Sequence, residues 1–309
     1  MFPLREVRNG MSNILIGGGT GFIGMPLSRL LKERGHEVHH LSRRANPKAE
    51  FPAHQWDINK MTIDQEAVDR ADVIINLAGA GIADKRWTAA RKKLIIDSRV
   101  KTTSLLAQSI SKRPSELPHY INSSAVGFYG NRGEAICTED MPAGDDFLSE
   151  SCQAWENSVE PIREMGIPTA IVRTGIVLHP SGGALEKMLQ PMALFTSGYF
   201  GNGQQWYSWI HMKDICGIYA HLIEKKLTGI YNGSAPNPAR NKTLAELLPK
   251  AKGKAAVVMP VPKFGLRLAL GEMADTILDS TRCSAEKIAE SGYSFEQPEL
   301  LAALENLLR

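Results

Sequence analysis

Short apolar runs alternate with amphipathic stretches through the first half of the chain. Strands are predicted at Asn13–Ile16, Glu37–Leu41, Val73–Leu77, Tyr120–Asn122 and Thr169–Arg173. Apolar residues at helical spacing predict a helix from about Gly21 to Arg34, and a polar helix is predicted from about Thr88 to Ser111. Strands and helices that alternate in this way predict an α/β fold, a doubly wound parallel sheet with helices on both faces.

The alternation breaks after about Pro180, where glycines and prolines mark long loops. Further helices are predicted near Ala184–Leu194, Ile215–Lys225 and Glu299–Leu308, the last with an apolar stripe of leucines that we expect to pack in a core. We therefore predict a sheet domain of residues 11–180, to which 211–232 return. Residues 181–210 and 233–309 would form a smaller C-terminal lobe.

The segment NILIGGGTGFIG, residues 13–24, connects the first predicted strand to the first helix. Gly18, Gly21 and Gly24 are spaced as GxxGxxG, and GxGxxG overlaps them from Gly19. A side chain at these positions would block the turn and keep the backbone away from a pyrophosphate, which the N-terminus of the following helix attracts. A flexible loop is the alternative, but the strand before and the helix after favour a Rossmann-type dinucleotide site.

Ser42, Arg43 and Arg44 follow the second predicted strand, about twenty residues beyond the last glycine. An NAD site carries an acid at this place for the ribose 2′-hydroxyl, whereas a guanidinium binds a 2′-phosphate. The sequence therefore favours NADP(H) over NAD(H), unless the two arginines are merely solvated. Asp57 is a candidate acceptor for the adenine amino group.

Composition excludes several classes of function. The 309 residues are 43% hydrophobic and 22% charged, and a net charge of +3 without a basic block gives no support to nucleic-acid binding. No apolar run approaches the length of a membrane span. The four cysteines lack metal-ligand spacing, so we expect no metal site and a cytoplasmic protein with reduced thiols. Residues 1–10 are either native or a leader before Met11, and we leave them out of the fold.

The blocks GGTGFIG, SRR, NLAGA and SSAVGFYG, in this order, resemble the extended short-chain dehydrogenase/reductases, the NAD-dependent epimerases and dehydratases. The later blocks RTGIVL, GQQWYSWIHMKD, APNP and GEMAD resemble an atypical, epimerase-like subgroup with a C-terminal module of unknown function. The resemblance spans Met11 to the C-terminus and implies a Rossmann domain with a C-terminal substrate lobe. It also implies cofactor contacts from Phe22, Ile23, Leu77, Ala78, Gly79 and Arg173.

The family's proton-transfer pair, Tyr-x-x-x-Lys, is missing. Ser124 matches the family's substrate-orienting serine, but aligning Glu156 with the glutamate after the pair puts Leu148 at the tyrosine and Cys152 at the lysine. Leucine carries no exchangeable proton, and a neutral thiol supplies no fixed positive charge.

Three residues could replace the pair. Tyr129, five residues after Ser124, is a candidate general acid or a packing tyrosine. His211 could protonate a substrate or be a structural histidine. Cys152 would need a lowered pKa to act as a nucleophile, and its acidic neighbours oppose that.

Two loops combine polar and aromatic side chains and should follow the carboxyl ends of strands, where open α/β sheets bind ligands. Together with His211 they give the predicted substrate site: Lys85, Arg86, Trp87, Gln205 and Trp206. Packing of the loops by the tryptophans is the alternative.

These observations favour an NADP(H)-dependent oxidoreductase or epimerase-type enzyme that acts on an unidentified small polar substrate, nucleotide sugars included. The alternative is a catalytically silent protein that senses NADPH and signals through a partner. The resemblance leaves a homodimer open.

Overall fold

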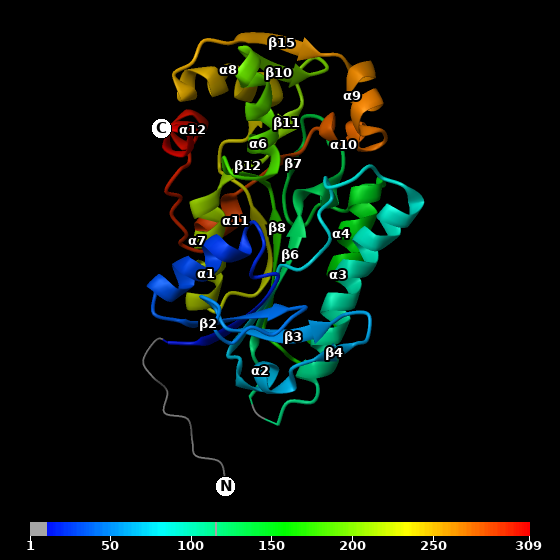
Figure 1. Ribbon diagram of the computed structural model, residues 1–309, viewed down its shortest axis with the longest axis vertical. Helices are drawn as coiled ribbons and strands as arrows, with labels where there is room; N and C mark the ends of the chain where they lie inside the picture. The colour runs from blue at the N-terminus through cyan, green and yellow to red at the C-terminus, as the bar shows by residue number, and fades with distance from the viewer. Residues whose placement is uncertain (1–10, 115) are drawn as a thin grey trace.

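The computed structural model describes residues 11–114 and 116–309. The question whether residues 1–10 belong to the native fold lies outside the described residues. Figure 1 shows an elongated molecule in which a central sheet with its helices lies below a smaller lobe.

The core of the molecule is an eight-stranded sheet in the order β13-β8-β6-β5-β1-β2-β3-β4. Its strands pair in parallel except β3 with β4. The strands are β1 (Asn13–Gly17), β2 (Glu37–Ser42), β3 (Ala53–Asp57), β4 (Thr62–Ile63), β5 (Val73–Asn76), β6 (His119–Ala125), β8 (Thr169–Thr174) and β13 (Gly229–Gly233). Strands covered on both faces read as continuous apolar runs, and β5, VIIN, is buried at every position. The predicted α/β doubly wound sheet is confirmed.

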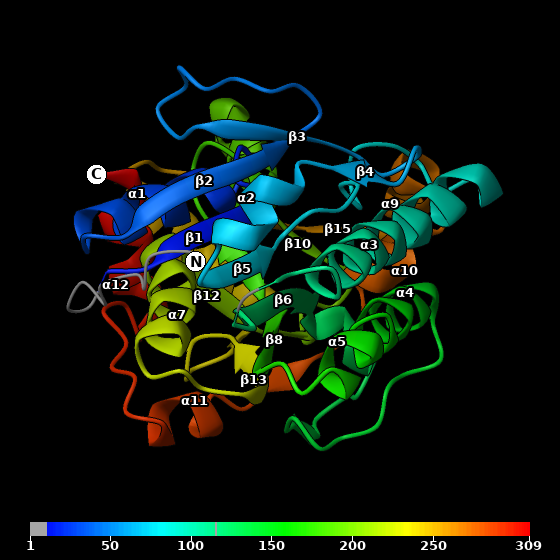
Figure 2. The same cartoon turned by 90° about the horizontal axis from the view of Figure 1, so that it is seen from below.

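Helices cover both faces of this sheet (Figure 2). On one face α1 and α7 pack on a core that includes Ile14, Leu27 and Ile215. On the other, Val68, Leu106 and Ile162 from three helices share a core with Leu15 and Ile74. The helices of this domain are α1 (Gly24–Glu33), α2 (Gln65–Arg70), α3 (Ala89–Ile110), α4 (Phe147–Asn157), α5 (Glu160–Glu164) and α7 (Met212–Glu224), with the 3₁₀ turn η1 (Val126–Tyr129).

Residues 181–210 and 233–309, which we name the C-terminal lobe, contribute most of a third core around Leu185, Leu244 and Leu304. Strands β10 and β15 pair in parallel at its far end. Its elements are α6 (Gly183–Leu189), η2 (Gln190–Leu194), β10 (Thr196–Phe200), β11 (Trp206–Tyr207), β12 (Trp209–His211), β14 (Ala239–Arg240), α8 (Asn241–Lys252), β15 (Val257–Val261), α9 (Lys263–Leu270), α10 (Met273–Ile277), β16 (Arg282–Cys283), α11 (Glu286–Glu290) and α12 (Leu300–Leu308). Strands β7 (Ile136–Cys137) and β9 (Ile176–Leu178) pair with β16 and β12.

Helix α11 departs from the predicted arrangement. Ala285 and Ile288 pack in the large core of the sheet domain, together with residues of α7 and with Tyr231 of β13. The chain therefore returns to the sheet domain a second time, after leaving it at 232, because α11 covers the edge strand β13.

No helix among the described residues is long and apolar enough to cross a membrane. Within the same residues no group of three or more His, Cys, Asp or Glu side chains is arranged to hold a metal ion.

Candidate functional site

The turn between β1 and α1 requires glycine. Gly18 has φ +81°, and a Cβ there would lie 3.0 Å from the backbone of Leu77 and Ala78. A Cβ at Gly24 would lie 2.3 Å from the carbonyl oxygen of Gly18. The turn is closed by the Gly21 N–H, which donates to the Gly18 carbonyl at 2.9 Å. The missing side chains thus let the turn fold tightly beside the loop that follows β5.

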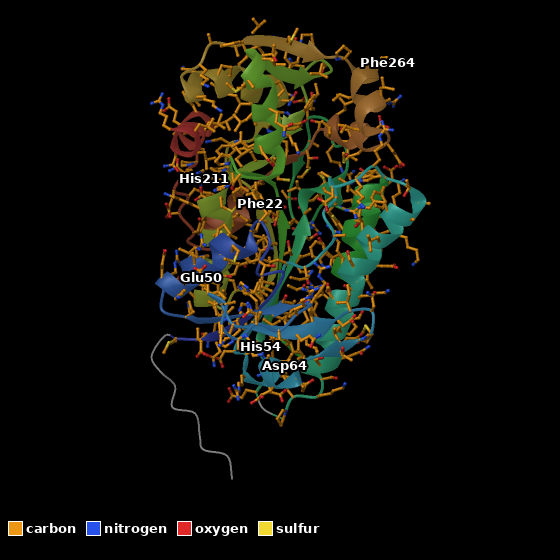
Figure 3. The ribbon with its side chains drawn as sticks, in the orientation of Figure 1. Phe22, Glu50, His54, Asp64, His211 and Phe264 are labelled. Atoms are coloured by element: carbon orange, nitrogen blue, oxygen red, sulfur yellow. The ribbon has the colours of Figure 1, made fainter. Side chains whose placement is uncertain are left out.

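The N-terminus of α1 is left open for an anion. No side chain caps it, and its first turn carries no acidic residue. Unpaired N–H groups and the positive end of the helix dipole attract phosphate at such a place. Phe22, just before the helix, is 38% exposed, and its ring packs edge-on against His179 with centroids 6.0 Å apart. Figure 3 shows it between the sheet and the C-terminal lobe.

Arg43 and Arg44 lie exposed at the carboxyl end of β2, the neighbour of β1. Neither guanidinium has a hydrogen bond or an ion pair with another described residue, and the Ser42 hydroxyl only accepts the Arg44 N–H at 3.5 Å. Nothing in the described chain competes with a ligand for these two cations.

Asp57, at the end of β3, is already engaged in a turn. Its Oδ1 accepts the N–H groups of Asn59 and Lys60 at 2.9 and 3.1 Å, and these bonds lower the pKa of the carboxyl group. The structure thus gives Asp57 a local role, and its predicted contact with adenine stays a prediction.

Ser124, at the end of β6, opens a buried polar network. Its hydroxyl donates to Glu156 Oε1 at 2.6 Å, and Glu156 receives both Nε and Nη2 of Arg173 at 2.9 Å. Arg173 Nη1 then donates to the hydroxyl of Tyr129 at 3.1 Å, and that hydroxyl donates to Asn232 Oδ1 at 2.7 Å. The network ties β6, α4, β8 and β13 together with every charge compensated, as buried charges require.

Two predicted site residues, Tyr129 and Arg173, belong to this buried network. The hydroxyl of Tyr129 points into the network, the residue is fully buried, and burial raises its pKa. Tyr129 also lines the cavity described below, but its hydroxyl is bound to Asn232 and Arg173, so its role as a general acid stays a prediction. Arg173 is 2% exposed, and its donors are used by Glu156, Tyr129 and the carbonyl of Glu139, so its predicted contact with the cofactor stays a prediction. The hydrogen bonds of both residues link elements of the sheet domain.

Helix α4 carries the two positions that match the family's acid/base pair. Leu148 packs against Gly127, whose Cβ would lie 3.2 Å from that of Leu148. Cys152 is buried beside Ser124, and burial together with nearby Glu156 raises the pKa of its thiol to about 11. A thiol with this pKa is neutral at pH 7, so the structure gives no support to Cys152 as a nucleophile.

The predicted substrate residues do not converge on one site. Gln205 is buried and donates to the Phe200 carbonyl. The guanidinium carbons of Arg240 and Arg282 lie 3.9 and 4.7 Å from the ring of Trp206. His211 caps α7 by accepting the Lys213 N–H at 3.0 Å, and burial lowers its pKa to about 4. None of these three side chains lines the cavity described next, so their predicted contact with a substrate stays a prediction. Figure 3 shows where His211 lies.

The loop of Lys85, Arg86 and Trp87 does border a cavity. Lys85 is exposed, and Arg86 donates to the Leu268 carbonyl on α9. Trp87 packs its ring edge-on against Phe147 at 4.7 Å and lines a cavity of about 1000 Å³ between the starts of α3 and α4 and the α10 region. Lys92 and Glu272 form an ion pair across it.

Acidic groups dominate the lining of this cavity. The sequence motifs did not reveal them, because they come from two distant segments: Asp145, Asp146 and Glu150, and Glu272, Asp275 and Asp279. The cations in the same lining are Lys92 and Arg132. Burial, with Asp146 and Asp275 nearby, raises the pKa of Asp279 to about 6. The cavity therefore disfavours anionic ligands.

Comparison with known proteins agrees with this architecture. Residues 14–232 match the model of the NAD dependent epimerase/dehydratase family, and residues 261–307 match DUF1731, a domain of unknown function. Epimerase family protein SDR39U1 of Bos taurus is 37% identical over 96% of this chain and 99% of its own length. Epimerase family protein YfhF of Bacillus subtilis is 36% identical over 96% and 98%.

Among solved structures, the crystal structure of human epimerase family protein SDR39U1 (isoform 2) with NADPH has a TM-score of 0.84 to this chain. Its sequence identity is 32%, over 96% of this chain and 99% of that one. The chain therefore belongs to the NAD dependent epimerase/dehydratase family, in the group of epimerase family proteins that carry the DUF1731 domain.

Proposed function

We propose that this protein binds NADP(H) and uses it as an oxidoreductase or epimerase-type enzyme on a small polar substrate. The observation that carries the proposal is the pair of unpartnered arginines, Arg43 and Arg44, at the end of β2 beside the uncapped start of α1. Two free guanidinium groups fit a ribose 2′-phosphate, and no carboxylate takes the place that an NAD site gives to an acid. The human relative crystallised with NADPH supports the same choice.

The cavity lined by Trp87 and Phe147 is our candidate for the substrate site. Its carboxylates would repel the diphosphate of a nucleotide sugar, so the charge favours a neutral or cationic polar substrate. Ser124 would orient a reacting oxygen only after giving up its bond to Glu156. The four buried, free cysteines support the cytoplasmic location that we propose with this function.

One observation favours the alternative of a catalytically silent NADPH-binding protein. The positions of the family's acid/base pair hold Leu148 and a buried Cys152, and Tyr129 is enclosed in the polar network. Under this alternative, cofactor binding would alter only the affinity for a partner.

The test is fluorescence titration with NADPH and NADH of the wild-type protein and of the double variant Arg43→Ala/Arg44→Ala. Loss of two charge-assisted contacts should weaken NADPH binding by about tenfold to a hundredfold and leave NADH binding nearly unchanged. Lys48→Ala, an exposed cation beyond the same strand, is the matched control. Equal effects on both cofactors, or a wild-type preference for NADH, would overturn the NADP(H) assignment. A second assay measures NADPH-dependent turnover of carbonyl substrates. Turnover that Ser124→Ala abolishes would support the enzyme, and no turnover in the wild type would support the catalytically silent protein.

A further inference from the structure

Arg99 is a largely buried cation without an anion. It lies on α3, and its Nη1 donates only to the backbone carbonyls of Ala80 and Ile95, at 3.1 and 2.9 Å. Its guanidinium carbon is 4.9 Å from the ring centre of Trp155. No carboxylate of the described chain forms an ion pair with it, in contrast to Arg173 and Glu156. Burial lowers the pKa of Arg99, as expected for a charge that the protein leaves uncompensated.

The remaining donors of Arg99 are open. Nε and Nη2 make no hydrogen bond with any described residue. Neither atom is among the fully buried polar atoms that lack a partner, so both can be reached by solvent or a ligand. A partly desolvated guanidinium with two free donors binds an oxygen-rich ligand strongly, because it has little water to give up.

Arg99 lies beside the loop that follows β5. A Cβ added to Gly79 would be 3.1 Å from its Cγ and 3.2 Å from its Cζ, so glycine at 79 makes room for the arginine. Cys152 of α4, the position that matches the family's lysine, lies near enough to Arg99 for the guanidinium to lower the pKa of the thiol, although burial raises that pKa by more. Arg99 thus places a positive charge where the lysine is missing.

The order of the strands predicts which half of a bound dinucleotide would lie next to Arg99. Arg43 and Arg44 follow β2, the glycine turn follows β1, and Gly79 and Ser124 lie at the ends of β5 and β6, in the order β2-β1-β5-β6 across the sheet. A dinucleotide lies across the carboxyl ends of such strands, with its pyrophosphate at the turn. When the adenine half is held at β2, the nicotinamide half lies over β5 and β6, next to Arg99.

We propose that Arg99 is a cofactor-binding residue whose guanidinium donates to the ribose oxygens of the nicotinamide half and so takes over the positive charge of the missing lysine. This inference rests on the proposed binding of NADP(H). It explains why Gly79 and an uncompensated arginine occur together, and why Cys152 can be a neutral thiol.

The test compares two ligands by isothermal titration calorimetry: NADPH, and adenosine 2′,5′-bisphosphate, which has the adenine half without the nicotinamide half. Arg99→Met should weaken NADPH binding by about tenfold or more, the effect of one charge-assisted contact, and leave bisphosphate binding within about twofold. Unchanged bisphosphate binding also shows that the variant is folded. Lys101→Met removes an exposed cation from the same helix and should alter neither ligand.

Two further variants sharpen the result. Arg99→Lys should retain part of the affinity, and Cys152→Lys in the Arg99→Met background should restore NADPH binding by returning the charge to the family's position. Loss of affinity for both ligands in equal measure, or no loss of NADPH affinity, would overturn the role of Arg99. A wild-type protein that binds neither ligand would instead overturn the proposed function, so the two failures are distinguishable.

Discussion

The two sides of the sheet edge use arginine in opposite ways. At the end of β2, Arg43 and Arg44 are exposed and have no partner among the described residues. At the end of β8, Arg173 is 2% exposed and has a partner for each nitrogen, with Glu156 as the bidentate acceptor. Open donors are available to a ligand, whereas satisfied donors stabilise the fold. The sequence alone does not distinguish the two kinds of arginine.

The largest effect on stability should come from breaking the buried ion pair between Glu156 and Arg173 at the end of β8. Glu156→Gln leaves the guanidinium of Arg173 buried without a counter-charge, which should lower the free energy of unfolding by about 3–5 kcal/mol. Urea denaturation measures this change. Glu160→Gln, which removes the exposed ion pair with Arg163, should cost less than about 1 kcal/mol. Comparable losses in the two variants would mean that the network does not act as a buried ion pair.

A smaller effect should follow from pH. Burial lowers the pKa of both His40 and His211 to about 4, from the ordinary value of 6.5. The unfolded chain then binds more protons than the folded one between these values, so stability is fully present above pH 6.5 and falls as the pH drops towards 4. Each histidine should cost about 2 kcal/mol at pH 5 relative to pH 7.

Denaturation at pH 7 and pH 5 tests this. His211→Gln and His40→Gln should each reduce the pH-dependent loss by about 2 kcal/mol. Burial also lowers the pKa of His36, His119 and His221, so part of the loss should remain in the double variant. An unchanged pH-dependent loss in either single variant would overturn the role of that histidine.

The smallest effect on stability should come from a change near the exposed arginines, at Asp57 at the end of β3. Asp57→Asn keeps an oxygen that can accept the two turn N–H groups, so we expect stability to change by less than about 0.5 kcal/mol. NADPH affinity, measured by titration, should change by less than about threefold if the role of Asp57 is to close the turn. A tenfold loss would restore the predicted contact with adenine.

Sequence patterns predicted the elements that carry their own signal. Strand β1, the glycine turn and α1 are continuous in the chain, and the predicted strands match β2, β5 and β8 to within a residue at each end. Strand β13 was not predicted, because Gly229–Gly233 is short and owes its burial to β8 and α11 rather than to its own pattern. Strand β3 was missed for a similar reason, since His54 and Gln55 interrupt its apolar positions.

The site was less predictable than the fold. Local motifs located the glycine turn and the arginine pair, because each lies within a few consecutive residues. The role of Tyr129 depends on Asn232, more than a hundred residues later, and that of Arg99 on the packing of α3 against α4. The spacing of residues along one sequence predicts neither contact, because the partners are far apart in the chain.

The position of α11 has a consequence for biosynthesis. The largest core joins Ile14 of the first strand to Ile288 of α11, so it cannot close until nearly the whole chain has left the ribosome. Nascent chains generally fold domain by domain, but the core of the sheet domain is complete only when α11 has been synthesised. Strand β13 lacks its cover from α11 during that interval, and an uncovered edge strand is open to pairing with other chains.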